Sequence, residues 1–294
     1  MKEYLYNHLK KPIKIVGISS SKRRDNECAR EDPISTELLK LCLNEAKKQG
    51  AKIEIIELSD LKIGACKECY STCPAQCRFS ETNYTCDCFT RTSDVLFNKK
   101  GEDFTIEKAY DVMTKKEFFD AYNSKWDFSP RDDMRIVYKK LLEADGIIFA
   151  TYSSFYSRPA LLQNMLSRLC ALDGGVEELW GDGKNLQASY NYTKEKGVYK
   201  QRLYGKHFGI INVSKEGDSV SPNLLKACTM MGMKNVPLGI GYGLSWYDDE
   251  THKTDKNKIL TSQYTLRLTK DLGKNIVKEI KTSSRKYGKE VDLV

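Results

Sequence analysis

Short apolar runs alternate with amphipathic stripes along most of the chain. Five runs are rich in β-branched residues and end at polar or small residues, as buried strands do; they occupy 13–19, 51–58, 145–151, 206–214 and 236–243. Apolar residues at helical spacing fill the segments between and after them, at 34–48, 131–144, 161–169, 221–232 and 258–281. Because the strands are continuously apolar, they predict an α/β fold whose parallel sheet is covered by helices on both faces. The simplest strand order for such a five-stranded sheet is 2-1-3-4-5, and this order is expected.

The last predicted helix, 258–281, is both amphipathic and basic. Its buried side is expected to carry apolar residues four apart, namely Leu260, Tyr264, Leu268, Leu272, Ile276 and Ile280. Residues 251–294 hold eleven Lys or Arg against five Asp or Glu, so most of the net charge of +8 falls there. The lysines are interleaved with aliphatic residues and few aromatics, which indicates a solvated face, so nucleic acid is not expected as a partner.

Two stretches interrupt the alternation within what is otherwise predicted to be a single domain, 1–294. A Cys-rich loop and helical insert spans 62–128, and a second insert rich in Gly, Tyr and Lys spans 173–205. Many aromatic residues of these inserts lie outside the expected core: Phe118, Phe119, Trp126, Trp180, Tyr190 and Tyr192. Apolar surface of this kind predicts a homo-oligomer, either a dimer or a tetramer.

Composition and cysteine usage narrow the class of protein. The sequence is 40% hydrophobic and 30% charged, as in a globular protein, and no run reaches the roughly 18 apolar residues of a membrane span. The N-terminus lacks the apolar core of a secretory signal, so a cytoplasmic location without membrane contact is expected. Six of the ten cysteines fall between Cys66 and Cys88, and this clustering favours metal over disulfides. Cys42, Cys170 and Cys228 lie on apolar helix faces and are expected in the core.

Three loops should converge at the ligand-binding edge of the sheet. Ligands of open parallel sheets bind beyond the carboxyl ends of the strands, where strand order reverses. The loops at 19–36, 151–158 and 213–220 follow those ends. The first supplies hydroxyls, backbone amides and a helix N-terminus, all of which suit a phosphate. Its other interpretation is a polar loop in which Ser35 or Thr36 caps the helix.

The residues of these loops resemble the flavodoxin-like NADPH-dependent FMN reductases, specifically their iron-sulfur flavoprotein branch. The first strand is followed by Gly-x-Ser-x-Ser-x-Arg, carried here by Gly17, Ser19, Ser21 and Arg23. The stretch 132–169 matches most strongly, from its Asp-Asp-Met start to Arg168. The resemblance implies a flavodoxin-like fold and an FMN phosphate held by Ser21, Arg23, Ser35 and Thr36. It also implies that residues 151–157 and 213–217 contact the flavin ring, with these candidates: Thr151, Tyr152, Ser153, Ser154, Phe155, Tyr156 and Ser214.

The usual Ser-Pro-x-Tyr is replaced here by Thr151-Tyr-Ser-Ser154, so Tyr152, Phe155 and Tyr156 all remain candidates for packing on the ring or in a subunit contact.

A compact cysteine motif follows the second predicted strand. It reads Cys66-x2-Cys69-x3-Cys73-x3-Cys77, with Cys86 and Cys88 beyond. Four closely spaced thiolates can wrap a four-iron four-sulfur cluster, whereas zinc ribbons use two separated Cys-x2-Cys pairs. A cluster is therefore favoured, with a zinc site or inert thiols as alternatives. The iron-sulfur flavoproteins usually carry Cys-x2-Cys-x2-Cys, and the extra residue here leaves open whether Cys86 or Cys88 replaces Cys73 or Cys77. Asp132 and Asp133 are interpreted as charges that stabilise a helix N-terminus.

Three functions follow from these patterns. The first is an FMN-dependent oxidoreductase that passes electrons between a donor such as ferredoxin, the cluster, and a small-molecule acceptor at the flavin, with no side-chain general base. The second is an NAD(P)H-dependent FMN reductase of quinones, nitro compounds or metal ions, with zinc or no metal at the cysteines. The third is a non-catalytic, zinc-stabilised module that binds nucleic acid through the basic helix.

Overall fold

The computed structural model describes twelve segments of the chain. They are residues 12–21, 33–67, 79–80, 84–86, 89, 132–153, 156–173, 201–214, 218–244, 247–248, 253–254 and 260–290. The chain divides into two compact units. Unit 1 comprises residues 1–61, 140–163 and 203–294, and unit 2 comprises 62–139 and 164–202. The helices α7 (Met134–Glu143) and α8 (Ala160–Arg168) each contribute residues to both units.

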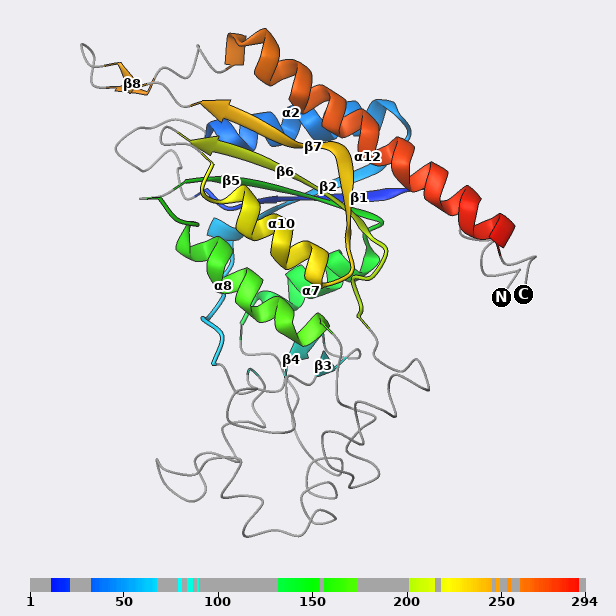
Figure 1. The fold of residues 1–294 in the computed structure, drawn as a ribbon. Helices are drawn as coiled ribbons and strands as arrows, with labels where there is room; N and C mark the ends of the chain where they lie inside the picture. The colour runs from blue at the N-terminus through cyan, green and yellow to red at the C-terminus, as the bar shows by residue number, and fades with distance from the viewer. Residues whose placement is uncertain are drawn as a thin grey trace, which may run out of the picture. The chain divides into compact units, whose positions relative to one another are not determined.

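Unit 1 is built on a five-stranded parallel sheet (Figure 1). Its strands are β1 (Lys14–Ser19), β2 (Lys52–Glu57), β5 (Gly146–Tyr152), β6 (His207–Ser214) and β7 (Lys234–Leu244). They pair in the order β2-β1-β5-β6-β7, which is the predicted order 2-1-3-4-5. All eight residues of β6 are buried, as expected of an inner strand of a parallel sheet that helices cover on both faces. The α/β fold class and the strand order are confirmed.

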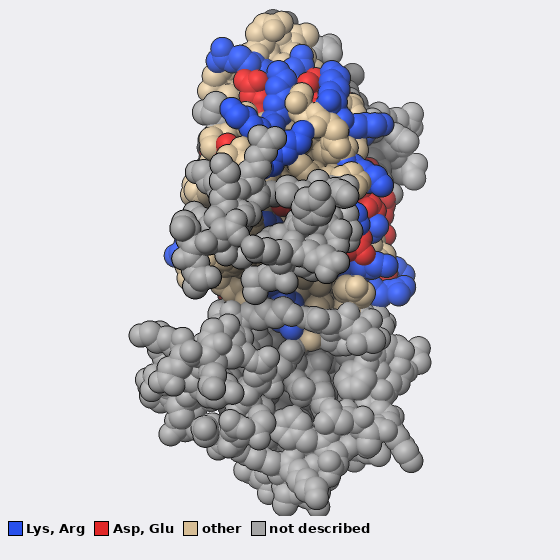
Figure 2. Space-filling model, turned by 90° about the vertical axis from the view of Figure 1, so that its right-hand side faces the viewer, with Lys and Arg blue, Asp and Glu red and all other residues tan. Residues whose placement is uncertain are grey.

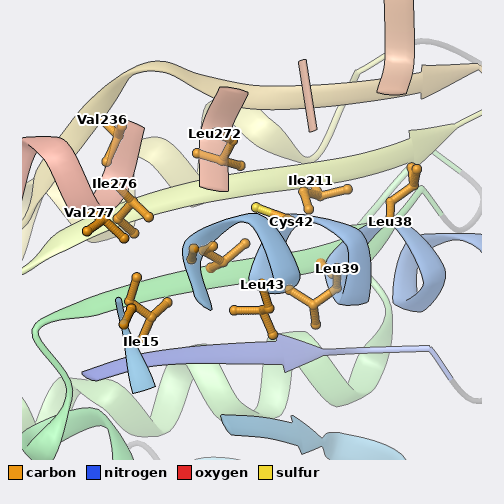
Figure 3. Close-up of a cluster of buried hydrophobic side chains, with 14 of the residues drawn as sticks. Ile15, Leu38, Leu39, Cys42, Leu43, Ile211, Val236, Leu272, Ile276 and Val277 are labelled. Carbon is orange, nitrogen blue, oxygen red and sulfur yellow. The ribbon is translucent and has the colours of Figure 1, made fainter. Parts of the chain in front are cut away.

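Helices α2 (Ile34–Lys48) and α12 (Gln263–Glu290) lie together on one face of this sheet, and α10 (Ser221–Met230) lies on the other (Figure 1). The first face holds a continuous core in which side chains of α2 and α12 meet those of the strands (Figure 3). Leu39, Leu43, Leu272 and Ile276 have no exposed surface there. Cys42 and Cys228 are also fully buried, as predicted, whereas Cys170 is only half-buried.

The C-terminal helix differs from its prediction in both register and length. Tyr264 is 61% exposed, and the buried positions near it are Thr265 and Thr269. A strict four-residue spacing drifts around a helix of 3.6 residues per turn, so the predicted stripe leaves the core at Tyr264, whereas its members Leu272, Ile276 and Ile280 are buried as predicted. The helix also runs to Glu290, past the end predicted at 281, because that end was placed just after Ile280, the last apolar residue of the stripe.

Unit 2 contains smaller elements. Besides its parts of α7 and α8, it holds the antiparallel pair β3 (Phe79–Ser80) and β4 (Thr85–Cys86) and a short 3-10 helix, Leu169–Leu172. The remaining short elements belong to unit 1: the 3-10 helix Leu58–Asp60 and the antiparallel pair β8 (Tyr247–Asp248) and β9 (Lys253–Thr254). Most of the predicted inserts 62–128 and 173–205, with the six aromatic residues behind the oligomer prediction, lie outside the described residues. The insert boundaries and the oligomer stay predictions.

The surface of unit 1 carries the basic character expected of its last helix. The sequence of α12 holds eight Lys or Arg against three Asp or Glu. Figure 2 shows Lys and Arg side chains interspersed with fewer acidic ones on the described part of one molecular face. Across the described segments, no helix is long and apolar enough to cross a membrane.

Candidate functional site

The carboxyl end of β1 is polar and buried. Ser19, Ser20 and Ser21 are at most 7% exposed, and Thr36, in the first turn of α2, is 2% exposed. The hydroxyls of Ser19 and Thr36 lie 2.7 Å apart in a hydrogen bond that joins the strand end to the helix start. Since one hydroxyl donates in that bond, the other keeps its proton for a further acceptor. The pair can therefore serve an anionic ligand without breaking its own contact.

Ser20 joins the end of β1 to the end of β5. Its backbone amide donates to the Ala150 carbonyl at 3.0 Å, and its hydroxyl lies 3.0 Å from Thr151 Oγ1. Successive strand side chains point to opposite faces, so Ser19 contacts α2 while Ser20 contacts the neighbouring strand. The two serines thus tie the end of β1 to the start of α2 and to the end of β5.

The ends of β5 and β6 are joined in the same way. The Ser153 amide donates to the Val213 carbonyl at 3.3 Å, and the hydroxyls of Ser153 and Ser219 lie 3.5 Å apart. Thr151 and Ser214 are at most 2% exposed. The described parts of the three predicted loops thus converge at one edge of the sheet.

Two buried polar atoms at this edge lack a hydrogen-bond partner within the described part of the chain. Asp218 accepts hydrogen bonds from Asn212 Nδ2 at 2.7 Å and from the Ser221 amide at 2.8 Å, which fixes the start of α10. Asn212 Oδ1 and Ser221 Oγ are buried and find no partner among the described residues. Burying such atoms is costly unless something hydrogen-bonds to them, so their position favours a polar ligand here.

Tyr156, in the loop after β5, combines exposure with an unfavourable backbone. The side chain is 64% exposed, and φ is 58°, in the left-handed region that a bulky residue rarely adopts. Such conformations persist where the surroundings or a function impose them. An aromatic side chain presented in this way suits packing against a flat ligand. Of the other two ring candidates, Tyr152 is half-buried and Phe155 lies outside the described residues.

Most of the predicted flavin-site residues belong to the described structure. Ser19, Ser21, Ser35, Thr36, Thr151 and Ser214 are all buried at the carboxyl edge. Arg23, Ser154 and Phe155 lie outside the described residues, so their roles stay predictions. The sequence interpretation missed Ser20, Asn212 and Asp218. A polar residue inside the apolar run of β6 was the available signal for Asn212, and an acidic residue three positions before a helix start was the signal for Asp218.

Of the four predicted metal ligands, the structure describes only Cys66. Cys66 is half-buried at the end of the described segment 33–67, whereas Cys69, Cys73 and Cys77 lie outside the described residues. Cys86 is buried in β4, and its alternative Cys88 is again outside them. No group of three or more His, Cys, Asp or Glu side chains placed to hold a metal occurs within the described segments. The ligand set stays a prediction.

Two buried titratable groups of unit 1 lie at the opposite edge of the sheet. Burial lowers the pKa of Lys206, whose amino group donates to the Leu142 carbonyl at 2.9 Å. Burial, and secondarily the charge of Lys234, lowers the pKa of His207, the first residue of β6. Lys206 directly precedes β6, and His207 begins it. Both therefore lie at the amino end of the strand, and neither belongs to the site at the carboxyl ends.

Comparisons with known proteins support the fold. No protein-family model matches the chain, and no curated protein matches it. The crystal structure of RosB with a bound intermediate, 8-demethyl-8-formylriboflavin-5'-phosphate, aligns with 92% of this chain and 79% of RosB at 15% identity, with a TM-score of 0.54. A flavone reductase aligns over 92% of this chain and 63% of its own at 16% identity, with a TM-score of 0.49. A flavodoxin from the domain Archaea aligns over 92% and 99% at 10% identity, with a TM-score of 0.38. The likeness to RosB shows that this chain has the flavodoxin-like fold.

Proposed function

We propose that the chain is an FMN-dependent oxidoreductase. It passes electrons between a one-electron donor such as ferredoxin, a four-iron four-sulfur cluster, and a small-molecule acceptor at the flavin. The observation that carries the flavin part is the convergence of buried hydroxyls from β1, α2, β5 and β6 at the carboxyl edge of a flavodoxin-like sheet. Ligands of such sheets bind at this edge.

The described residues fit a phosphorylated flavin. Ser19 and Thr36 retain a hydroxyl proton for a phosphate oxygen, and the start of α2 favours negative charge. Ser21 and Ser35, which are also buried, would contact the phosphate too, together with Arg23, which lies outside the described residues. RosB, which shares this fold, holds a riboflavin phosphate derivative in its crystal structure.

The protein would position and tune the flavin. FMN itself supplies the exchange between one-electron and two-electron chemistry. The loop that contains Thr151, Ser153 and Tyr156 would orient the ring, and its hydrogen bonds to the ends of β1 and β6 hold that loop in place. The cluster part of the proposal rests on the spacing of Cys66, Cys69, Cys73 and Cys77.

Replacing Cys66 with serine tests the cluster. In protein prepared without oxygen, we expect about four iron atoms per chain with matching acid-labile sulfide, and the variant should lose most of this iron because one thiolate ligand is gone. FMN content should change little, since the flavin site is built from unit 1 and Cys66 belongs to unit 2. Iron, sulfide and flavin assays measure all three.

The matched control is Cys170→Ser, which removes another half-buried thiol of unit 2 that lies outside the motif. This control should keep its iron. Stoichiometric zinc without sulfide in the unmodified protein would contradict the cluster, and the NAD(P)H-dependent reductase would then be the better account.

A further inference from the structure

The segment that leads into the cysteine motif is held by several side chains of unit 2. The Lys62 amide donates to Asp133 Oδ2 at 2.9 Å, and the Asp133 amide returns a bond to the Lys62 carbonyl at 3.0 Å. Asn164 Nδ2 donates to the Ile63 carbonyl at 3.4 Å. The Gly64 amide donates to Asp132 Oδ2 at 3.1 Å, and its carbonyl accepts from Arg168 at 3.3 Å. Three consecutive residues are therefore fixed just before Cys66.

Arg168 and Asp132 form the centre of this arrangement. Arg168 Nη1 lies 2.6 Å from Asp132 Oδ2 and Nη2 lies 3.4 Å from Oδ1, and the side chains are 1% and 9% exposed. Besides the Gly64 amide, the Met134 amide at the start of α7 donates to this carboxylate, at 3.2 Å from Oδ1. Burial acts to lower the pKa of Arg168, but its bond to Asp132 and the neighbouring groups raise the pKa above its ordinary value, so the guanidinium stays charged.

The aromatic ring of Phe89 packs on Arg168 and lies close to residues on both sides of Cys66 in the sequence. The guanidinium carbon of Arg168 lies 3.4 Å from the ring centroid, and Lys67 Nζ lies 5.0 Å from it. A side chain at Gly64 would meet the same ring, because a Cβ there would lie 2.7 Å from Phe89 Cε1. Cys66 thus sits between two residues, Gly64 and Lys67, that both contact the Phe89–Arg168 pair.

Stability alone does not account for a buried ion pair at this place. Removing two charges from water costs about as much as their attraction returns, and an apolar pair of similar volume is often as stable. Arg168 also leaves its Nε without a hydrogen-bond partner among the described residues. What the pair does supply is directed hydrogen bonding to both Gly64 and the start of α7.

We propose that Arg168, together with Asp132, is the positioning residue for the thiol of Cys66, the first cysteine of the metal-binding motif. The metal role of that thiol rests on the proposed function, whereas the anchoring does not. Arg168 acts through the Gly64 carbonyl, Asp132 and Phe89, and so holds the backbone on which Cys66 is presented. Lysine cannot replace it fully, because a single ammonium lacks the planar fork whose two nitrogens contact the two carboxylate oxygens of Asp132.

The test is the rate at which iodoacetamide alkylates Cys66, followed by peptide mass spectrometry on the full-length protein as purified. Arg168→Met and Asp132→Asn should each raise this rate by about tenfold, because the segment opens locally more often. Arg168→Lys should give an intermediate rate. Arg135→Met, the same substitution at an exposed position of α7, is the matched control and should leave the rate unchanged.

Further measurements distinguish misfolding of a variant from loss of the anchoring and from failure of the proposed function. Cys42 and Cys228, fully buried in unit 1, and Cys86, buried in unit 2, should stay unreactive and so report that both units of the variants are folded. If a single variant does not fold, the double variant Asp132→Leu/Arg168→Met removes both charges together and carries the same test. An unchanged Cys66 rate in folded variants would overturn the anchoring. A protein that lacks metal or FMN would instead contradict the proposed function, while the alkylation rates still decide the anchoring.

Discussion

Replacing Thr36 with aspartate is expected to abolish FMN binding under ordinary assay conditions, with a loss of affinity of about a thousandfold. The Thr36 hydroxyl is buried and bonded to Ser19 at 2.7 Å, at the start of α2 where the phosphate is proposed to sit. Two like charges about 4 Å apart repel by about 4 kcal/mol near a protein surface, which is about three powers of ten in affinity. Quenching of FMN fluorescence on titration measures the change.

Two variants control this experiment. Asn44→Asp adds the same charge to the same helix at an exposed position and should bind FMN as the unmodified protein does. Thr36→Val removes the hydroxyl without adding charge and should weaken binding by about tenfold, the value of one hydrogen bond to a charged group. If Thr36→Asp binds as tightly as Asn44→Asp, the phosphate does not lie at the start of α2.

Replacing Gly273 with alanine should destabilise the protein by about 2–3 kcal/mol, the cost of forcing extra volume into a packed core. Within a helix this substitution ordinarily stabilises by about 1 kcal/mol, so the expected sign is reversed. At Gly273 a Cβ would lie 2.1 Å from the Cys42 carbonyl oxygen and 3.1 Å from Glu45 Cβ. The nearest obstacle is backbone, which cannot rotate away, so α2 and α12 would have to separate.

Urea unfolding followed by circular dichroism measures this loss. Lys278→Ala, at an exposed position little more than a turn further along α12, should change the free energy of unfolding by less than about 0.5 kcal/mol. A stabilised Gly273→Ala variant would show that α2 and α12 are not packed as closely as described.

The sheet and its helices were predictable because their information is local. The stripe of Leu38, Leu39, Cys42 and Leu43 defines α2, and its observed bounds, Ile34–Lys48, are the predicted ones. The end of α12 was not predictable in this way. Between Ile280 and Glu290 the sequence holds no aliphatic residue, so no apolar period marks where the helix ends.

The strand ends predicted which loops form the candidate site, and the family resemblance supplied Ser21 and Thr36 within the first loop. Ser20 was missed because its role depends on which strand lies next to β1. The interpretation of Asp132 as a helix-start charge is confirmed by its bond to the Met134 amide, yet it is incomplete. Its pairing with Arg168 joins residues 36 positions apart and has no local signature.

Binding of FMN compared with riboflavin tests the central claim most directly. The two ligands share the ring and differ in the phosphate, which the account places against Ser19, Ser21, Ser35 and Thr36. Calorimetric titration of the purified full-length protein should give one FMN per chain, with riboflavin bound at least about a hundredfold more weakly, a difference of about 2.7 kcal/mol. Failure to bind either flavin, or equal affinity for both, would contradict a phosphate-anchored flavin at the carboxyl edge of the sheet.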